Sequence, residues 1–361
     1  MVGMRDVAKK AGVSLSTVSL VVNGNGYVSD DMRERVRKAM QALNYVPNEL
    51  ARNLYHDCTN LVGVIVPPIR HPFFATFTAH LQHALAAQGL RTMLCSTADE
   101  ADGEIQYVDM LRRHMMDGIV MCAHTSHPGD YWTSIHRPIV AFDRVLGDGI
   151  SSIGSDHEQG GRLIAQMLIR NGAKHVVMIG GPRDQFFDLA ARGEVEEGPF
   201  DLGKTTFPTV RYYLTLEQEL TSAGVKYEYV EAGEVMDFAG YHRAVSNALD
   251  KVTTDGVDAV VSSDIGAALC VREAMRRHIS IPRDLQIIAY DGTYLTDLAG
   301  MKMTAVAQNF DKIAQVAVGN IVRAIAKEGD AKADTTSATG RKPYEPDVLI
   351  PVTRKLGDTT R

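Results

Sequence analysis

The feature that most constrains the fold of this chain is an alternation of short apolar runs with amphipathic helical stretches, which begins at residue 61. The apolar runs cover residues 61–66, 91–95, 118–122, 139–142, 176–179, 257–262 and 285–290. Helical patterns lie between most of them, at 74–88, 160–171, 239–251 and 265–278. This rhythm is typical of the parallel, doubly wound sheets of α/β proteins. Two such half-sheets with a cleft between them would fill residues 61–361, and ligands of such folds bind at the carboxyl ends of the strands.

The residues before 61 follow a helical pattern instead. Residues 6–23 read DVAKKAGVSLSTVSLVVN, which predicts two short helices joined by a three-residue turn. Gly12 can end the first helix with a left-handed backbone, and Ser14 can cap the second by accepting a backbone N–H bond. The valines of the second helix then face the first, whereas its outward side chains are Leu15, Ser16, Thr17, Ser19, Leu20 and Asn23. Such a face suits a DNA major groove, although an ordinary helical hairpin is the alternative.

A third helix and a short linker complete the N-terminal part. Ser29 with the two acids that follow it is a typical helix start, and one apolar face continues to about residue 44. Residues 48–54 could form about two helical turns, which are marginal in water without a partner. We therefore expect a helix-turn-helix head over 1–46, a hinge helix and linker over 47–60, and a two-lobed domain over 61–361.

The charge of the chain is divided unevenly between head and body. The formal net charge of −6 is unexpected for a DNA-binding protein. Residues 1–60, however, hold eight basic and six acidic residues, so the head and linker together carry +2 and the remainder −8. A mildly basic head on an acidic body fits a DNA-reading domain fused to a domain that does not touch DNA.

Composition narrows the class of protein. Apolar content of 45% and charged content of 23% are typical of a soluble globular protein. We see no apolar stretch near the roughly 20 residues that span a membrane and no signal-peptide h-region, so we expect a cytoplasmic protein without a membrane partner. The cysteines are scattered without metal-ligand spacing, which predicts reduced thiols, no metal site and no cofactor. These cysteines are Cys58, Cys95, Cys122 and Cys270.

Two stretches depart from the α/β alternation. Residues 183–210 are rich in Gly, Pro and acids, and residues 327–346 are polar and rich in Thr and Ala. The second is typical of a surface loop. We interpret both as insertions.

Several motifs together resemble those of the LacI family of transcription regulators. The head signature consists of residues 6–23, YVPN at 45–48 and ARNL at 51–54. The body adds HPFF at 71–74, IGGP at 179–182, SD at 263–264, YD at 290–291 and QNF at 308–310. The resemblance covers nearly the whole chain. It implies a repressor that binds palindromic double-stranded operator DNA as a homodimer, is associated with the nucleoid when bound, and responds to a small, sugar-like effector.

The resemblance assigns DNA-binding roles within the head. It places Leu15, Ser16 and Leu20 at base-reading positions of the second helix. The remaining positions fix the register on DNA through phosphate contacts or the cap of this helix, and they are Ser14, Thr17, Ser19, Asn23, Tyr27 and Ser29. Leucine at position 20 can offer only methyl contact, for example to a thymine methyl group, so direct base reading is expected to be weak there.

The resemblance also implies a hinge helix that folds on operator DNA. Its DNA-binding residues are Asn48, Ala51, Arg52 and Leu54. Leu54 of each subunit would enter the minor groove at the centre of the site and kink the DNA, at a cost that added contacts offset. The alternative is that Leu54 is an apolar residue at the start of the body.

For the body, the resemblance implies an effector site between the lobes. Its candidate residues are Phe73, Asp143, Ser263, Asp264, Asp291, Gln308 and Phe310. Asp143 and Asp291 each follow a predicted strand and would accept hydroxyl hydrogens, while Phe73 would offer a ring face. Carboxylates, an amide and aromatic rings suit a neutral polyol. A lone aspartate at a strand end could instead cap a helix or a loop.

The resemblance further implies an arginine in the effector site. Arg192 is near the spacing of the family, but a helical pattern begins only at Arg211, and we favour Arg211. Both arginines could also be surface charges. Some relatives place an aromatic residue near position 235, where this chain has Val235, so a particular ligand does not transfer.

Other functions receive less support from the sequence. We see no nucleophile–base pairing, metal-ligand spacing, P-loop or GxGxxG motif, so we do not expect an enzyme. Exported sugar-binding proteins share the body pattern, but the DNA-reading head and the lack of a signal peptide argue against that class. Control by a protein corepressor remains an alternative to a metabolite. The chain ends in PVTRKLGDTTR without an apolar heptad, so we expect the assembly to stop at a dimer.

Overall fold

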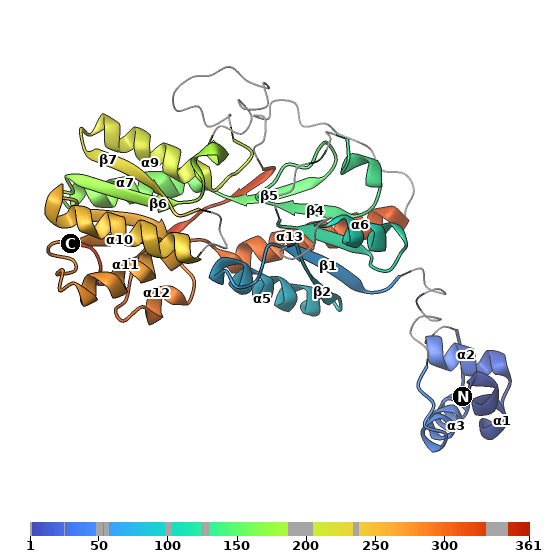
Figure 1. Cartoon of the computed structure of the whole chain (residues 1–361). Coiled ribbons are helices and arrows are strands. Elements are labelled where there is room, and N and C mark those ends of the chain that lie inside the picture. Colours follow the sequence, from blue (N-terminus) through green and yellow to red (C-terminus); the bar gives the residue numbers. More distant parts are fainter. Residues whose placement is uncertain are drawn as a thin grey trace. The chain divides into compact units, whose positions relative to one another are not determined.

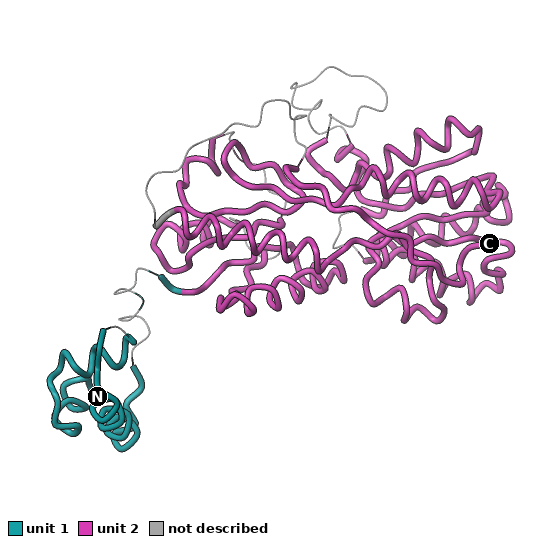
Figure 2. The backbone as a smooth tube through the Cα atoms, turned by 180° about the vertical axis from the view of Figure 1, so that it is seen from behind, with its two compact units in different colours: residues 1–59 teal, residues 60–361 magenta. Residues whose placement is uncertain are grey.

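The chain folds into two compact units, Met1–Thr59 and Asn60–Arg361 (Figure 2). The structure, a computed structural model, describes residues 2–24, 26–47, 53, 58–97, 103–123, 127, 130–186, 205–233, 238–329 and 346–361. Within these ranges, no helix has the length and apolar content that crossing a bilayer would require.

The described residues of the first unit form three helices, α1 to α3, around a small apolar core. They are α1 (Met4–Ala11), α2 (Leu15–Asn23) and α3 (Asp30–Ala42). As predicted, Gly12 ends α1 with a left-handed backbone of φ 64°, and the hydroxyl group of Ser14 accepts a hydrogen bond from the Thr17 amide. Ser29 caps α3 in the same way through the Met32 amide. The core consists of Val7, Ala8, Ala11, Val18, Val36 and Ala39.

The second unit has two lobes, each built on a six-stranded sheet (Figure 1). The strands of the N-lobe are β1 (Leu61–Val66), β2 (Arg91–Ser96), β3 (Gly118–Met121), β4 (Ile139–Phe142), β5 (Ser151–Ser155) and β11 (Val348–Ile350). They pair in the order β11-β5-β4-β3-β1-β2, and all pairs are parallel. Alternate residues of β1 serve opposite faces, because Val64 packs with helices α5 (Pro72–Ala87) and α13 (Phe310–Gly329), whereas Ile65 packs with α6 (Ile105–Arg112).

The C-lobe repeats this architecture. Its strands are β6 (His175–Gly180), β7 (Lys226–Glu231), β8 (Ala259–Ser263), β9 (Gln286–Asp291), β10 (Thr304–Ala307) and β12 (Thr353–Lys355). They pair in the order β12-β10-β9-β8-β6-β7, and only β12 is antiparallel. Helices α7 (His157–Arg170) and α9 (Val210–Ser222) cover one face. Helices α10 (Phe238–Thr254) and α11 (Asp264–Arg276) cover the other, and α12 (Leu295–Leu298) is a single turn.

The chain passes between the lobes three times. Strand β5 ends in the N-lobe and leads to α7 in the C-lobe, β10 leads back to α13, and β11 leads to β12. The predicted fold class, two doubly wound parallel sheets after a helical head, is confirmed. All seven predicted apolar runs are strands, and the four predicted helical patterns lie in α5, α7, α10 and α11.

Candidate functional site

The second head helix presents short polar and apolar side chains to solvent. Leu15 is 43% exposed and Leu20 is 38% exposed, whereas Val18 on the opposite face is fully buried. Ser16 is also exposed, and Thr17, Ser19 and Asn23 are half-buried. Methyl groups therefore stand beside hydroxyl and amide groups on a single helix face, which is the chemistry that reads base edges and phosphates.

Hydrogen bonds hold the polar groups of α2 in place. The Ser14 hydroxyl lies 2.7 Å from Ser16 Oγ and 2.8 Å from Thr17 Oγ1. Asn23 Nδ2 donates to Ser19 Oγ at 3.2 Å. Because these groups are already ordered, contacts with a ligand would cost less side-chain entropy.

Arg35, which the sequence analysis did not single out, fixes the turn between α1 and α2. Its guanidinium donates to the Ala11 carbonyl at 3.1 and 2.7 Å and to the Gly12 carbonyl at 2.9 Å. These carbonyls belong to the end of α1, where no further helical N–H follows. The φ of 64° at Gly12 favours glycine, and a Cβ atom there would lie 2.9 Å from this guanidinium, so a larger residue would also displace Arg35.

Two expected DNA contacts differ in their surroundings. Tyr27 is 93% exposed, so its ring is available to a partner. Ser29 already accepts the Met32 amide as the cap of α3, at 3.4 Å. The expected hinge contacts lie outside the described residues, and they are Asn48, Ala51, Arg52 and Leu54.

In the second unit, a cavity of about 710 Å³ lies where the strands of both sheets end. Cys122 and Asp143 follow β3 and β4 of the N-lobe, while Gly180, Ser263 and Asp291 end β6, β8 and β9 of the C-lobe. The sequence predicted a ligand site at these carboxyl ends. The volume lies in the upper part of the range of roughly 300–1,000 Å³ that is typical of small-molecule sites.

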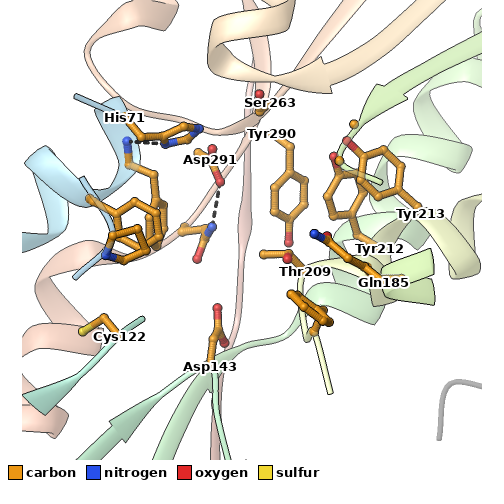
Figure 3. Close-up of a pocket in the computed structure, with 18 of the residues that line it drawn as sticks. His71, Cys122, Asp143, Gln185, Thr209, Tyr212, Tyr213, Ser263, Tyr290 and Asp291 are labelled. Atoms are coloured by element: carbon orange, nitrogen blue, oxygen red, sulfur yellow. Dashed lines mark hydrogen bonds between the residues drawn. The ribbon is translucent and has the colours of Figure 1, made fainter. Parts of the chain in front are cut away.

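Aromatic rings form two walls that face each other across the cavity (Figure 3). On one side, the ring centres of Phe73 and Phe74 lie 5.1 Å apart, and Phe74 contacts His71. On the other side, the rings of Tyr212 and Tyr213 lie 3.9 Å apart. The second wall also contains Phe186, Phe207, Tyr229 and Tyr290.

Asp143 and Asp291 point into the middle of the cavity from opposite lobes (Figure 3). Both are 6% exposed, and both adopt a positive φ, of 47° and 119° respectively. Such backbone costs energy in a residue other than glycine and is typical of functional sites. The oxygens of Asp143 lie 3.2 Å from the Ser155 amide and 3.0 Å from His157 Nε2. Gln308 Nε2 donates to Asp291 Oδ1 at 2.9 Å.

The electrostatics of the cavity favour neutral groups. Burial holds the pKa of Asp291 well above its usual range, and the nearby charge of Asp264 adds to the effect. Burial also lowers the pKa of His71 to about 4. A protonated Asp291 can donate a hydrogen bond, whereas a carboxylate can only accept one. The site can therefore offer both kinds of partner to the hydroxyl groups of a sugar.

The remaining predicted effector residues divide into two groups. Phe73, Ser263 and Gln308 line the cavity, and Ser263 Oγ donates to the Tyr241 hydroxyl at 3.3 Å. Asp264 and Phe310 lie behind its wall. Asp264 accepts hydrogen bonds from the Gly292 amide and from both the amide and hydroxyl of Thr293, so it holds the loop after β9.

Phe310 packs 5.5 Å from the Phe73 ring as part of the N-lobe core. It reaches that core because α13 returns from the C-lobe at Phe310. Its contribution to the cavity is therefore to support Phe73.

Of the two candidate arginines, Arg211 lies away from the large cavity. Arg211 is 6% exposed and lies in a smaller pocket of about 190 Å³, with its Nη1 3.7 Å from Glu158 Oε1. It points there because α9 begins at Val210 and turns this position toward α7. Arg192 lies outside the described residues.

The cavity also contains residues that the sequence analysis did not predict. Arg144 donates to the Asp143 carbonyl at 2.5 Å, and Gln185 lies beside the second aromatic wall. The turn that carries Gln185 is held by Arg183, whose guanidinium binds Glu217 at 2.5 and 3.0 Å and lies 4.1 Å from the Phe186 ring. The tyrosine pair at 212–213 was visible as an aromatic start of a helical pattern, but nothing in the sequence showed which way it faced.

The part of the chain that the structure describes contains no set of side chains suited to binding a metal ion. No three His, Cys, Asp or Glu side chains gather there so that they could hold a metal ion. The four cysteines are thiols and do not form disulfides.

Comparisons with known proteins match both units. A family model described as "Bacterial regulatory proteins, lacI family" matches residues 3–48. "Periplasmic binding proteins and sugar binding domain of LacI family" matches residues 59–194, and "Periplasmic binding protein-like domain" matches residues 165–342.

Individual relatives extend over most of the chain. A protein named "Sucrose operon repressor" from Streptococcus mutans serotype c is 31% identical over 89% of this chain and 92% of its own length. A "Ribose operon repressor" from Bacillus subtilis is 32% identical over 81% of this chain and 82% of its own. The Lac repressor dimer bound to operator and the anti-inducer ONPF has a TM-score of 0.76 at 21% identity, covering 99% of both chains. The last likeness is one of fold.

Proposed function

The chain belongs to the LacI family of bacterial regulatory proteins, and we propose that it is a transcriptional repressor whose affinity for operator DNA is controlled by a small sugar. It is a DNA-binding regulator and not an enzyme, like its relatives. We assign residues 1–46 to DNA binding, 47–60 to the hinge and linker, and 61–361 to effector binding and dimerisation.

The exposed face of α2 supports the proposed mode of DNA binding. Leu15, Ser16 and Leu20 would read bases in the major groove, with Ser14 ordering the start of the helix. Phosphate contacts fall to Thr17, Ser19, Asn23, Tyr27 and Ser29. The hinge residues Asn48, Ala51, Arg52 and Leu54 would add minor-groove contacts, with Leu54 as the wedge that kinks the site.

We propose a homodimer on a palindromic site. Residues 1–60 carry a net charge of only +2, and a second subunit doubles the number of phosphate contacts. Each such contact releases counterions. Large apolar side chains exposed on the second unit offer surface for a partner copy. They include Leu94, Met275, Tyr294, Leu298 and Leu356. The repressor would act in the cytoplasm, associated with the nucleoid while it is bound to DNA.

The cavity between the lobes carries the proposal of a sugar effector. Asp143, Asp291 and Gln308 converge there between two aromatic walls. Hydroxyl groups pair with such carboxyl and amide groups, while the C–H faces of a sugar ring lie against aromatic rings. We assign effector contact to Phe73, Asp143, Ser263, Asp291 and Gln308, with Asp264 and Phe310 as their support. We further propose induction, in which the bound sugar weakens operator binding.

A ligand screen tests this proposal. Neutral mono- and disaccharides, including sucrose and ribose, are added to the full-length protein, and the melting temperature is recorded. A sugar that binds only the native state must raise it, by an amount that grows with its concentration. The same sugar should change operator affinity by about 5–150-fold, the usual size of allosteric coupling. An operator affinity that no sugar changes, but that a protein corepressor does change, would overturn the proposal.

A further inference from the structure

A chain of buried hydrogen bonds connects the two carboxyl groups of the cavity across the lobes. The Ser155 amide donates to Asp143 Oδ1 at 3.2 Å, and the Ser155 hydroxyl donates to Gln308 Oε1 at 2.6 Å. Gln308 Nε2 then donates to Asp291 Oδ1 at 2.9 Å. Ser155 ends β5 and Gln308 follows β10, so this chain runs through two of the three crossovers. The N-lobe carboxyl group is thereby linked to the C-lobe carboxyl group.

His157 adds a second link from behind the cavity. Its Nε2 lies 3.0 Å from Asp143 Oδ2, and its Nδ1 lies 2.7 Å from the Tyr290 hydroxyl. His157 is the first residue of α7 in the C-lobe and is 2% exposed, whereas Asp143 follows β4 in the N-lobe. The imidazole therefore bridges the lobes. It does not line the large cavity but lies against the smaller pocket.

The partners of His157 fix its orientation. A carboxylate only accepts hydrogen bonds, so Nε2 carries the hydrogen and donates to Asp143, which leaves Nδ1 to accept from the Tyr290 hydroxyl. The Tyr290 ring is stacked 3.9 Å from Tyr212 at an angle of 6°. A Cβ atom at Gly160 would lie only 2.7 Å from the same ring, so Tyr290 is closely packed. The Ser155 amide and His157 Nε2 together contact both oxygens of Asp143.

We propose that His157 is a positioning residue that makes ligand binding at Asp143 depend on the relative placement of the two lobes. The proposal rests on the proposed function, because it takes operator affinity to be controlled from this cavity. A ligand shifts an equilibrium only by its difference in affinity for the two states. His157 contacts Asp143 Oδ2 from the other lobe, so this part of the orientation of Asp143 depends on where the two lobes lie relative to each other. A ligand hydroxyl that donates to this carboxylate consequently favours the state in which the bridge is made.

A first experiment needs no ligand. The amide hydrogen of Ser155 is protected by Asp143, so its exchange rate with solvent reports on the orientation of that carboxylate. We expect exchange at Ser155 to be about tenfold faster in His157→Phe and in Tyr290→Phe, the size of one lost hydrogen bond. Tyr290→Phe removes a single hydroxyl and keeps the stacked ring. It therefore remains informative if His157→Phe folds poorly.

His175→Phe is the matched control. His175 is 3% exposed in β6 and is hydrogen-bonded to the Asp255 carbonyl at 3.1 Å, away from the cavity. Its replacement lowers overall stability without touching the bridge. Exchange at Ser155 that is no faster in Tyr290→Phe than in the wild type or in His175→Phe would overturn the proposal.

A second experiment measures operator affinity with saturating sucrose or ribose and without sugar. With the site saturated by sugar, a variant that merely binds the sugar more weakly still responds fully. A reduced response then means that sugar binding and operator binding are no longer coupled. The ratio of the two affinities should fall to within about threefold of one in His157→Phe and Tyr290→Phe. It should be partly restored in His157→Gln, which can both donate and accept, and unchanged in His175→Phe.

The outcomes separate this inference from the proposed function. A wild-type protein that responds, together with variants that respond equally at saturation, would refute the role of His157. A wild-type protein that responds to neither sugar would count against the proposed effector class, and the exchange at Ser155 would still decide whether His157 orients Asp143.

Discussion

Replacement of Asp291 by asparagine should stabilise the ligand-free protein at neutral and alkaline pH. Asp291 is 6% exposed, and burial together with the charge of Asp264 holds its pKa well above the ordinary value of 3.8. Asparagine keeps the shape of the side chain and an oxygen that can accept from Gln308 Nε2. It removes only the ionisation that this site opposes.

The direction and size of this change in stability follow from proton linkage. Between pH 3.8 and its raised pKa, Asp291 keeps a proton in the folded state that the unfolded chain has released. Its contribution to stability is fully present below pH 3.8 and is lost as pH rises, at about 1.4 kcal/mol per pH unit until the folded pKa is reached. Asp291→Asn lacks this slope. Its free energy of unfolding should therefore exceed that of the wild type by a margin that grows with pH.

Burial also raises the pKa of Asp264, to about 6, so Asp264→Asn removes a similar pH slope, but we expect this change to destabilise the protein through lost hydrogen bonds. Asp264 accepts from the Gly292 amide at 3.2 Å and from the Thr293 amide and hydroxyl at 2.5 and 2.6 Å. A single amide oxygen cannot take all three donors, and an NH₂ group would face one of them. Each buried donor left without a partner costs about 1–3 kcal/mol. Two neighbouring Asp→Asn changes should thus move stability in different directions.

The assay is urea unfolding, followed by circular dichroism, from about pH 5 to about pH 8. The wild type should lose stability relative to Asp291→Asn across this range, and Asp264→Asn should be the least stable of the three at pH 5, where the ionisation of Asp264 costs the wild type least. If the free energy of unfolding changed with pH in the same way in the wild type and in Asp291→Asn, the reasoning would be refuted. Sugar binding supplies an independent check, because Asp291→Asn should weaken it while operator binding without sugar persists.

Four further results are expected. Arg35→Ala should weaken operator binding about tenfold, because two carbonyls at the end of α1 lose a charged donor, whereas Arg35→Lys should lose less in a fluorescence-anisotropy titration. The logarithm of operator affinity should fall linearly with the logarithm of salt concentration, and a flat dependence would contradict phosphate contacts by the head. His71→Asn should reduce the loss of stability as pH falls from 6.5 toward 4, since burial lowers the pKa of His71 to about 4 and asparagine keeps the cap of α5. Sedimentation should detect a dimer that binds one palindromic operator, and a protein that binds the operator as a monomer would contradict the proposed assembly.

Local chemistry explains why much of this fold could be predicted. Strand β1 reads LVGVIV because parallel strands covered on both faces are continuously apolar. The caps at Ser14 and Ser29 depend on residues three positions away. Strand β7 was missed because its residues, KYEYVE, are half-exposed at the edge of the sheet and read as polar. Strands β11 and β12 have three residues each, too few to show a period.

The candidate site was predictable only where it depends on strand ends. Asp143 and Asp291 follow apolar runs, so their place at the carboxyl edge follows from the α/β rhythm. Sequence cannot show that Arg211 turns toward α7, because that depends on the residue at which α9 begins, and no local pattern marks that start. The tyrosines of the same helix face the cavity for the same reason, and an error of one residue in that register would rotate every side chain by about 100° around the helix axis.

The contacts of His157 with both lobes are an example of a feature that sequence periodicity cannot predict. A histidine at the start of an amphipathic helix gives no sign that its partners lie 14 residues before it and 133 residues after it. Those partners meet because β5 leads from one lobe into α7 of the other, a path fixed by how whole sheets pack rather than by any local pattern. The residues that bind a ligand can thus be inferred one lobe at a time. The residues that let the lobes respond together depend on the crossovers and become visible only once both lobes are assembled.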